Sequence, residues 1–253
     1  GSQNITGLQN VFLGAYAGNE NLTGNKNVLI GYEAGREGTI GDSNVFVGHG
    51  AGRNKKGEKN VAVGFNALSA GYESANYNIA IGYEAGKNAG NTYTLRSGGG
   101  VYIGTAAGYN ATGGIAIGDS SCKNCQTPEA FVNIAIGHLS LLNTTSGIKN
   151  TALGINTLLK NTTGGENTAI GFDALQKNTI GINNVAVGND NSIENTTGFN
   201  NTSVGARTLL NNNSGENNTA LGFEALSVNT IGDRNTAIGV SAGPLNNNFL
   251  NTT

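Results

Sequence analysis

The 253-residue sequence contains no methionine, no tryptophan and only two prolines, and charged residues make up only 12 % of it. A disordered chain of low hydrophobicity normally carries a high net charge, whereas this one has a formal net charge of −2, which argues against disorder. Collagen is excluded because it needs abundant proline and glycine at every third position. The near-neutral charge gives no reason to expect a nucleic acid or an anionic membrane as partner. No run of 18 apolar residues is present, so we expect no membrane insertion of this segment.

The sequence does contain a glycine that closes a short apolar run at nearly constant spacing. The steps between successive glycines are 17, 17, 16, 18, 22, 14 and 19, and then 17 six times. A fixed period of this length indicates stacked repeats. These anchor glycines are Gly14, Gly31, Gly48, Gly64, Gly82, Gly104, Gly118, Gly137, Gly154, Gly171, Gly188, Gly205, Gly222 and Gly239.

We number each repeat from its anchor glycine, position 0. Position −1 is Ile, Val or Leu in every repeat, position −3 is β-branched, and position −2 is mostly Ala. This alternation predicts a short strand bounded by turn residues. A 17-residue period is too short for helical repeats or propeller blades. We therefore predict an all-β fold, a parallel β-solenoid of about fourteen coils in one domain, 1–253, with regular coils over 137–243 and irregular coils with loop insertions at about 86–131.

Positions −3 and −1 share one face of the predicted strand, and we expect that face to lie inside the coil. The alanine column would then lie on the outer face, where a second chain could approach. Because several buried residues are only Ala, the core of one chain is small against the entropy of ordering each coil. We therefore expect the chain to form an oligomer, and favour a trimer.

Asparagine recurs at position −4, as at Asn10, Asn27, Asn167 and Asn235. In stacked coils these amides can hydrogen-bond to one another along the column. Glycine, as at Gly14, Gly31, Gly171 and Gly239, allows turns that need positive φ. Both columns are therefore predicted to be structural, not ligand-binding.

The strings NTAIGFDAL, NTALGINTL and NTTGGENTAIG resemble the head repeats of trimeric autotransporter adhesins and, more closely, the longer repeats of bacteriophage tail fibres. The resemblance implies a left-handed parallel β-roll that forms a homotrimer and takes part in adhesion or receptor binding. It also implies an extracellular location, on a bacterial cell surface or in a virion tail fibre. The period is nearer 17 than the 14 to 15 of the adhesin heads, and the coiled-coil stalk and membrane anchor of that family are not recognisable. The chain starts Gly1-Ser2 and both ends fall inside a repeat, so we interpret it as a segment of a longer array.

The repeat is least regular between Gly82 and Gly137, where extra residues lie at roughly 88–100 and 120–130. Insertions in repeat proteins form loops, often on the binding face. All eight tyrosines also lie in the first half, between Tyr16 and Tyr109, and tyrosine is favoured at recognition surfaces. Tyrosines that only cover the roll are the alternative. The predicted binding residues are Tyr72, Tyr77, Tyr93, Arg96 and Tyr109.

Cys122 and Cys125 form the sequence's only cysteine pair, for which a local disulfide and two free thiols both stay open. One pair cannot complete a zinc site, and His49 and His138 are five coils apart, so we expect no metal and no cofactor. Carboxylates recur at position +2, as at Glu33, Glu84, Asp173 and Glu224, and are interpreted as a solvated face.

The function predicted from these observations is a non-enzymatic fibre or adhesin segment that attaches to a host or cell-surface receptor, with a glycan as the expected ligand. Two alternatives stay open. A tailspike-like polysaccharide-degrading enzyme would need clustered acids. An ice-binding solenoid would use the threonines at position −3, which we expect inside the coil.

Overall fold

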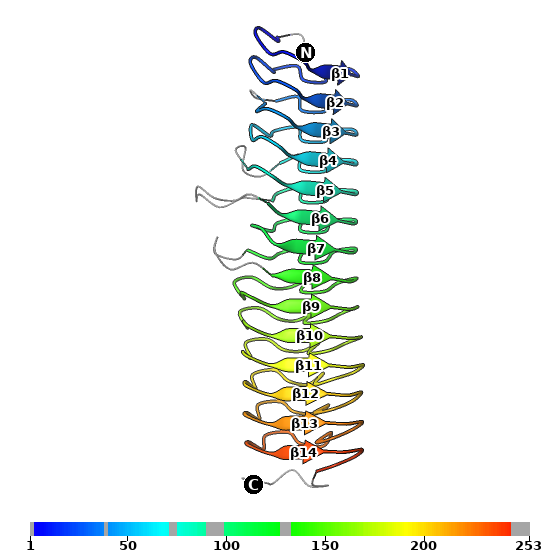
Figure 1. The fold of residues 1–253 in the computed structure, drawn as a ribbon, viewed down its shortest axis with the longest axis vertical. Helices are drawn as coiled ribbons and strands as arrows, with labels where there is room; N and C mark the ends of the chain where they lie inside the picture. Colours follow the sequence, from blue (N-terminus) through cyan, green and yellow to red (C-terminus); the bar gives the residue numbers. More distant parts are fainter. Residues whose placement is uncertain (1–2, 38–39, 71–74, 90–98, 127–132, 244–253) are drawn as a thin grey trace. The chain divides into compact units, whose positions relative to one another are not determined.

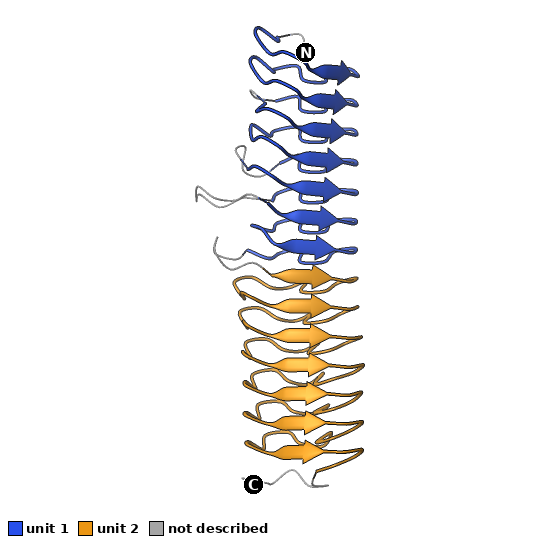
Figure 2. Cartoon of the chain, in the orientation of Figure 1, with its two compact units in different colours: residues 1–130 blue, residues 131–253 orange. Residues whose placement is uncertain are grey.

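The computed structural model describes residues 3–37, 40–70, 75–89, 99–126 and 133–243. The chain divides into two compact units, Gly1–Ala130 and Phe131–Thr253, which we call unit 1 and unit 2 (Figure 2). Each unit is described separately below. The insertion residues 90–98 and 127–132, and with them Tyr93 and Arg96, lie outside the described residues.

Each repeat contributes one three-residue strand at positions −3 to −1, and successive strands stack in parallel within each unit (Figure 1). The register is one repeat per coil, as in the pairing of Val11 with Val28 in unit 1 and of Thr168 with Val185 in unit 2. The predicted parallel β-solenoid is therefore confirmed. Unit 1 contains β1 (Val11–Leu13), β2 (Val28–Ile30), β3 (Val45–Val47), β4 (Val61–Val63), β5 (Ile79–Ile81), β6 (Val101–Ile103) and β7 (Ile115–Ile117). Unit 2 contains β8 (Ile134–Ile136), β9 (Thr151–Leu153), β10 (Thr168–Ile170), β11 (Val185–Val187), β12 (Thr202–Val204), β13 (Thr219–Leu221) and β14 (Thr236–Ile238).

The anchor glycine is required by both its backbone angle and its surroundings. Gly14 has a φ of 127°, a region that residues with a Cβ avoid. A Cβ on Gly14 would lie 2.6 Å from the carbonyl oxygen of Gly31, the anchor of the next coil. The glycine column thus lets neighbouring backbones approach at the corner that follows each strand.

The prediction about the two strand faces is wrong. The residues at position −2 are buried, from Leu29 and Phe46 to Ala220, whereas positions −3 and −1 point outward. Leu13 is 64 % exposed and Ile238 is 68 % exposed. The alanine column therefore lines the interior, and the larger β-branched residues and the threonines form an outer face.

The reason is the narrow interior of the coil, where position −2 meets position +4. Unit 2 mostly combines Ala at −2 with Leu at +4, and Leu209, Ala220, Leu226 and Ala237 form one apolar cluster there. In several coils of unit 1 the large residue is at position −2 and the small one, a glycine, is at position +4. A Cβ on Gly18 would lie 2.8 Å from the Phe12 ring, and a Cβ on Gly52 would overlap the Phe46 ring. A large residue at −2 thus requires a glycine at +4.

The asparagine column at position −4 forms the predicted ladder. In unit 2, Nδ2 of Asn184 donates to Oδ1 of Asn167 at 3.1 Å and to the carbonyl oxygen of Gly198 at 2.8 Å. Oδ1 of Asn184 accepts from the backbone N–H of Asn201 at 3.0 Å. Each amide therefore bonds to the amide side chain of the preceding coil and to two backbone groups of the following coil, as buried polar groups require.

A second amide ladder, which the sequence analysis did not identify, runs along position +7. It comprises Asn161, Asn178, Asn195, Asn212 and Asn229, joined by side-chain hydrogen bonds of 2.8–2.9 Å. In the coil of β3 the same position is occupied by Lys55, which is fully buried and donates to the carbonyl oxygen of Ala89. Burial lowers the pKa of Lys55 to about 8.

One polar cluster interrupts the apolar interior of unit 2. Ser192 stands where neighbouring coils have Leu at +4, and Ser203 where they have Ala at −2. Their hydroxyl oxygens are 2.9 Å apart, and both serines hydrogen-bond to Oδ1 of Asn191. All three residues are buried, so their polar atoms satisfy one another inside the coil.

Candidate functional site: tyrosines of unit 1 and a polar groove of unit 2

Two of the predicted binding residues can be placed, and Tyr72, Tyr93 and Arg96 lie outside the described residues. Tyr77 is 55 % exposed, and its hydroxyl oxygen accepts a hydrogen bond of 3.2 Å from Nζ of Lys59. The Lys59 ammonium also lies 5.0 Å from the Tyr77 ring centroid. These contacts, with Glu58 beside them, raise the pKa of Lys59.

Tyr109 lies between two lysines of neighbouring coils. Nζ of Lys87 is 5.6 Å and Nζ of Lys123 is 5.8 Å from the ring centroid. The pKa of Lys87 is raised, chiefly by its hydrogen bond to the Glu84 carboxylate. Tyr77 and Tyr109 therefore have separate sets of partners among the described residues.

Unit 1 also carries an exposed aromatic ladder that sequence reasoning missed. The rings of Tyr32, His49, Phe65 and Tyr83, all at position +1, stack with centroids 5.0–5.3 Å apart, and Tyr16 packs edge-on against Tyr32. The sequence does contain a pattern that predicts this ladder, because an aromatic residue directly follows four successive anchor glycines. Because each inner ring has neighbours on both sides, its edges face solvent more than its faces do.

The histidines and cysteines support no metal centre in the described part of the chain. His49 belongs to the aromatic ladder, and no group of three His, Cys, Asp or Glu residues with metal-binding geometry occurs among the described residues. Cys122 and Cys125 form a buried disulfide. They occupy positions +4 and +7, so residues 120–125 belong to a regular coil and not to an insertion, contrary to the sequence-based boundary.

The expectation that the carboxylates at position +2 form a solvated face holds only in part. Glu33 is buried and forms ion pairs with Arg36 and Arg53. Glu84 pairs with Lys87, and Glu224 pairs with Arg207. These acids are thus held by cations, and the Arg53 guanidinium pairs with both Glu33 and Glu37.

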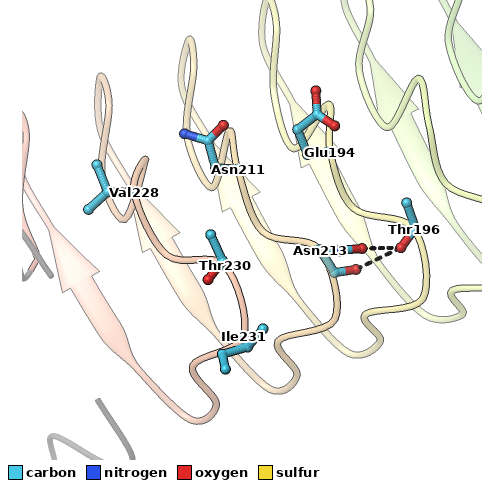
Figure 3. A pocket seen from close by; sticks show the side chains of 7 residues that line it. All are labelled: Glu194, Thr196, Asn211, Asn213, Val228, Thr230 and Ile231. Carbon is cyan, nitrogen blue, oxygen red and sulfur yellow. Dashed lines mark hydrogen bonds between the residues drawn. The ribbon is translucent and has the colours of Figure 1, made fainter. Parts of the chain in front are cut away.

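The described part of unit 2 has an open groove of about 820 Å³ across the coils of β11, β12 and β13 (Figure 3). Residues at position +6 form one side of the groove and residues at position +8 form the other. The groove therefore runs from coil to coil and is not confined to one turn. It is lined by Glu194, Thr196, Asn211, Asn213, Val228, Thr230 and Ile231.

Hydrogen bonds between coils hold both sides of the groove. Oγ1 of Thr196 donates to the carbonyl oxygen and to Oδ1 of Asn213 (Figure 3). Nδ2 of Asn211 donates to the carbonyl oxygen of Ser227 at 2.8 Å. The Glu194 carboxylate pairs with Lys177 at 2.5 Å. The groove is therefore polar, largely neutral and built on a regular backbone.

No protein-family model matches this chain, and no curated protein or solved structure is detectably similar to it. Within the described ranges, no helix has the length and apolar character needed to cross a membrane.

Proposed function

We propose that this chain is a non-enzymatic, homotrimeric fibre segment that carries adhesion to a host or cell-surface receptor, outside the cell. The observation that carries the proposal is the outward face at positions −3, −1 and +1, which has Ile, Val or Leu at −1 in every repeat and recurring apolar residues at −3 and +1. It includes Leu13 and Ile81 in unit 1 and Phe172, Leu221 and Phe223 in unit 2, all of which are exposed in the single chain. Extended apolar faces of this kind favour association with another protein surface.

A second copy of the chain is the partner that best suits this face. The apolar residues of the second copy recur at the same spacing as the apolar residues of the first, so the two sets can cover one another. Association would also supplement the small alanine-rich interior of each coil. The number three comes from the resemblance to trimeric fibre repeats. The ion pairing of Glu33, Glu84 and Glu224 supports a non-enzymatic function, since a glycoside hydrolase needs two carboxyl groups that are available to act at one bond, whereas basic side chains already hold these acids.

The molar mass in solution, measured by light scattering at micromolar concentration, tests the proposed assembly. Leu221→Lys places a charge in the apolar face and is expected to dissociate the trimer. Asn200→Lys is the matched control, because lysine already occurs at the same repeat position at Lys26, Lys59 and Lys149. A monomeric wild type, or a Leu221→Lys variant that stays trimeric, contradicts the assembly. A wild-type trimer that does not adhere to cells of the natural host would contradict the receptor-binding function.

One observation favours ice binding as a second candidate function. Thr202, Thr219 and Thr236 lie outward on successive strands, contrary to the expectation that they are buried. The same face cannot bind ice while it is covered by another chain. Thermal hysteresis from a monomeric protein would therefore support ice binding against the fibre proposal.

A further inference from the structure

The groove of unit 2 has the spacing of a polymer-binding surface. Thr196, Asn213 and Thr230 follow one another at 17-residue steps, and the backbone N–H of each of the first two donates to the carbonyl oxygen of the next. Neighbouring positions are therefore one strand spacing apart, ~4.8 Å. A ligand laid along the groove would meet a hydrogen-bonding side chain at position +8 at each step.

The chemistry of the lining combines hydrogen-bonding groups with small apolar patches. Asn211 and Asn213 offer amide groups and Thr230 a hydroxyl, while Val228 and Ile231 are exposed hydrocarbon, Ile231 at 61 %. Sugar rings present both hydroxyl groups and C–H surfaces. Sites that place a few polar groups among apolar ones suit such ligands.

The backbone of the groove disfavours an extended peptide. A peptide that adds as a strand needs free main-chain partners. Here the N–H groups of Thr196 and Thr197 both donate to Asn213, and those of Asn213 and Ser214 donate to Thr230. The polar contacts left for a ligand are side-chain amides and hydroxyls.

The charge of the groove disfavours an acidic polymer. Its one charged lining residue is Glu194, whose carboxylate is paired with Lys177. An anionic polysaccharide would meet this carboxylate with no excess positive charge among the lining residues. An uncharged ligand avoids that repulsion.

We propose that this groove binds an extended, uncharged β-1,4-linked glycan along the coils, with one sugar residue per coil. The advance of such a chain per sugar is close to the spacing of the coils, so three consecutive sugars would each meet one of the three lining coils. This inference rests on the proposed receptor-binding function and identifies its ligand class. It moves the predicted binding surface from the tyrosines of unit 1 to the regular coils of unit 2.

Isothermal titration of the full chain with cello- and chito-oligosaccharides tests the proposal. Affinity is expected to rise up to the trisaccharide and then to level off. Maltohexaose, an α-linked glucan that curves away from a straight groove, is expected to bind more weakly. No binding of either β-linked series, or equal binding of maltohexaose, overturns the proposal.

Two variants locate the site. Asn211→Ala is expected to weaken binding about tenfold, the effect of losing one good hydrogen bond. Asn143→Ala is the matched control, because Nδ2 of Asn143 makes the same 2.8 Å bond to the backbone in the coil of β8, outside the groove. Val228→Lys fills the groove and is expected to abolish binding, while Lys160 and Lys177 at the same repeat position indicate that the coil accommodates lysine.

The outcomes separate this inference from the proposed function. If the Val228→Lys protein still binds the glycan as wild type does, the groove is not the site. If the wild type adheres to cells but binds no β-linked glycan, the inference fails and the fibre function stands. If the wild type binds the glycan in the groove but neither trimerises nor adheres, the proposed function fails and the site stands.

Discussion

Replacement of Phe46 by alanine is expected to destabilise unit 1 by about 3–5 kcal/mol, the usual cost of removing a fully buried phenylalanine ring. Phe46 is completely inaccessible, and its ring fills the space that Leu fills in other coils. Gly52 faces this ring and has a φ of 59°. The two positions therefore divide one volume between them.

The informative variant is the double replacement Phe46→Ala and Gly52→Leu. It reproduces the arrangement of Ala152 and Leu158, in which Leu158 is buried at a φ of 50°. Refilling the space should recover most of the lost free energy, less about 1–2 kcal/mol for placing a leucine in the left-handed region. Gly52→Leu alone should be strongly destabilising, because its side chain overlaps the Phe46 ring.

Hydrogen exchange of the backbone amides in β2, β3 and β4 is the appropriate assay, because a repeat protein need not unfold in one step. Guanidinium unfolding followed by circular dichroism gives the global effect. The double-mutant cycle should show Gly52→Leu to be harmful with Phe46 present and beneficial with Ala at that position. If Gly52→Leu has the same effect in both backgrounds, the proposed sharing of volume is refuted.

Two further predictions concern buried polar groups. Asn184→Ala removes the acceptor of the buried Asn201 N–H and should lower the free energy of unfolding by about 1–3 kcal/mol, seen as faster hydrogen exchange of the Asn201 amide. The exposed control Asn189→Ala should change that free energy by less than about 0.5 kcal/mol. Equal effects of the two replacements would contradict a stabilising role of the asparagine ladder. Because burial lowers the pKa of Lys55 to about 8, the unfolded state binds more protons above that pH. Stability should therefore rise from about pH 8 toward pH 10.5, by about 3 kcal/mol in total, and Lys55→Asn should abolish this rise in chemical-denaturation curves; an unchanged slope would show that another group is responsible.

The strand positions and the asparagine ladder could be predicted because both depend on a local pattern that recurs at a fixed step. The direction of the strand faces could not, because alternation alone does not say which face is inside. The coil is too narrow to take the larger residues at positions −3 and −1 inside. The pairing of Phe46 with Gly52 and of Ala152 with Leu158 was visible in the sequence, and it would have shown that positions −2 and +4 meet.

The candidate site was less predictable than the fold. The tyrosines drew attention to unit 1 because their side chains are conspicuous in a sequence poor in aromatic residues. The groove of unit 2 consists of residues such as Asn211 and Thr230, which are common throughout the repeat. Only the stacking of three coils turns these ordinary residues into a concave surface.

The cluster of Asn191, Ser192 and Ser203 has a consequence for how the chain finds its alignment. Neighbouring repeats are near copies, so a chain that loops out one repeat would still stack alanine on alanine and amide on amide. Such an error would bring Ser192 against Ala220, or Leu175 against Ser203, and would remove the hydrogen bonds of Ser203 to Ser192 and Asn191, at about 1 kcal/mol each. The cluster therefore gives the correct alignment of the repeats a lower free energy than an alignment that skips one repeat. A single buried asparagine specifies the register of a coiled coil in the same way.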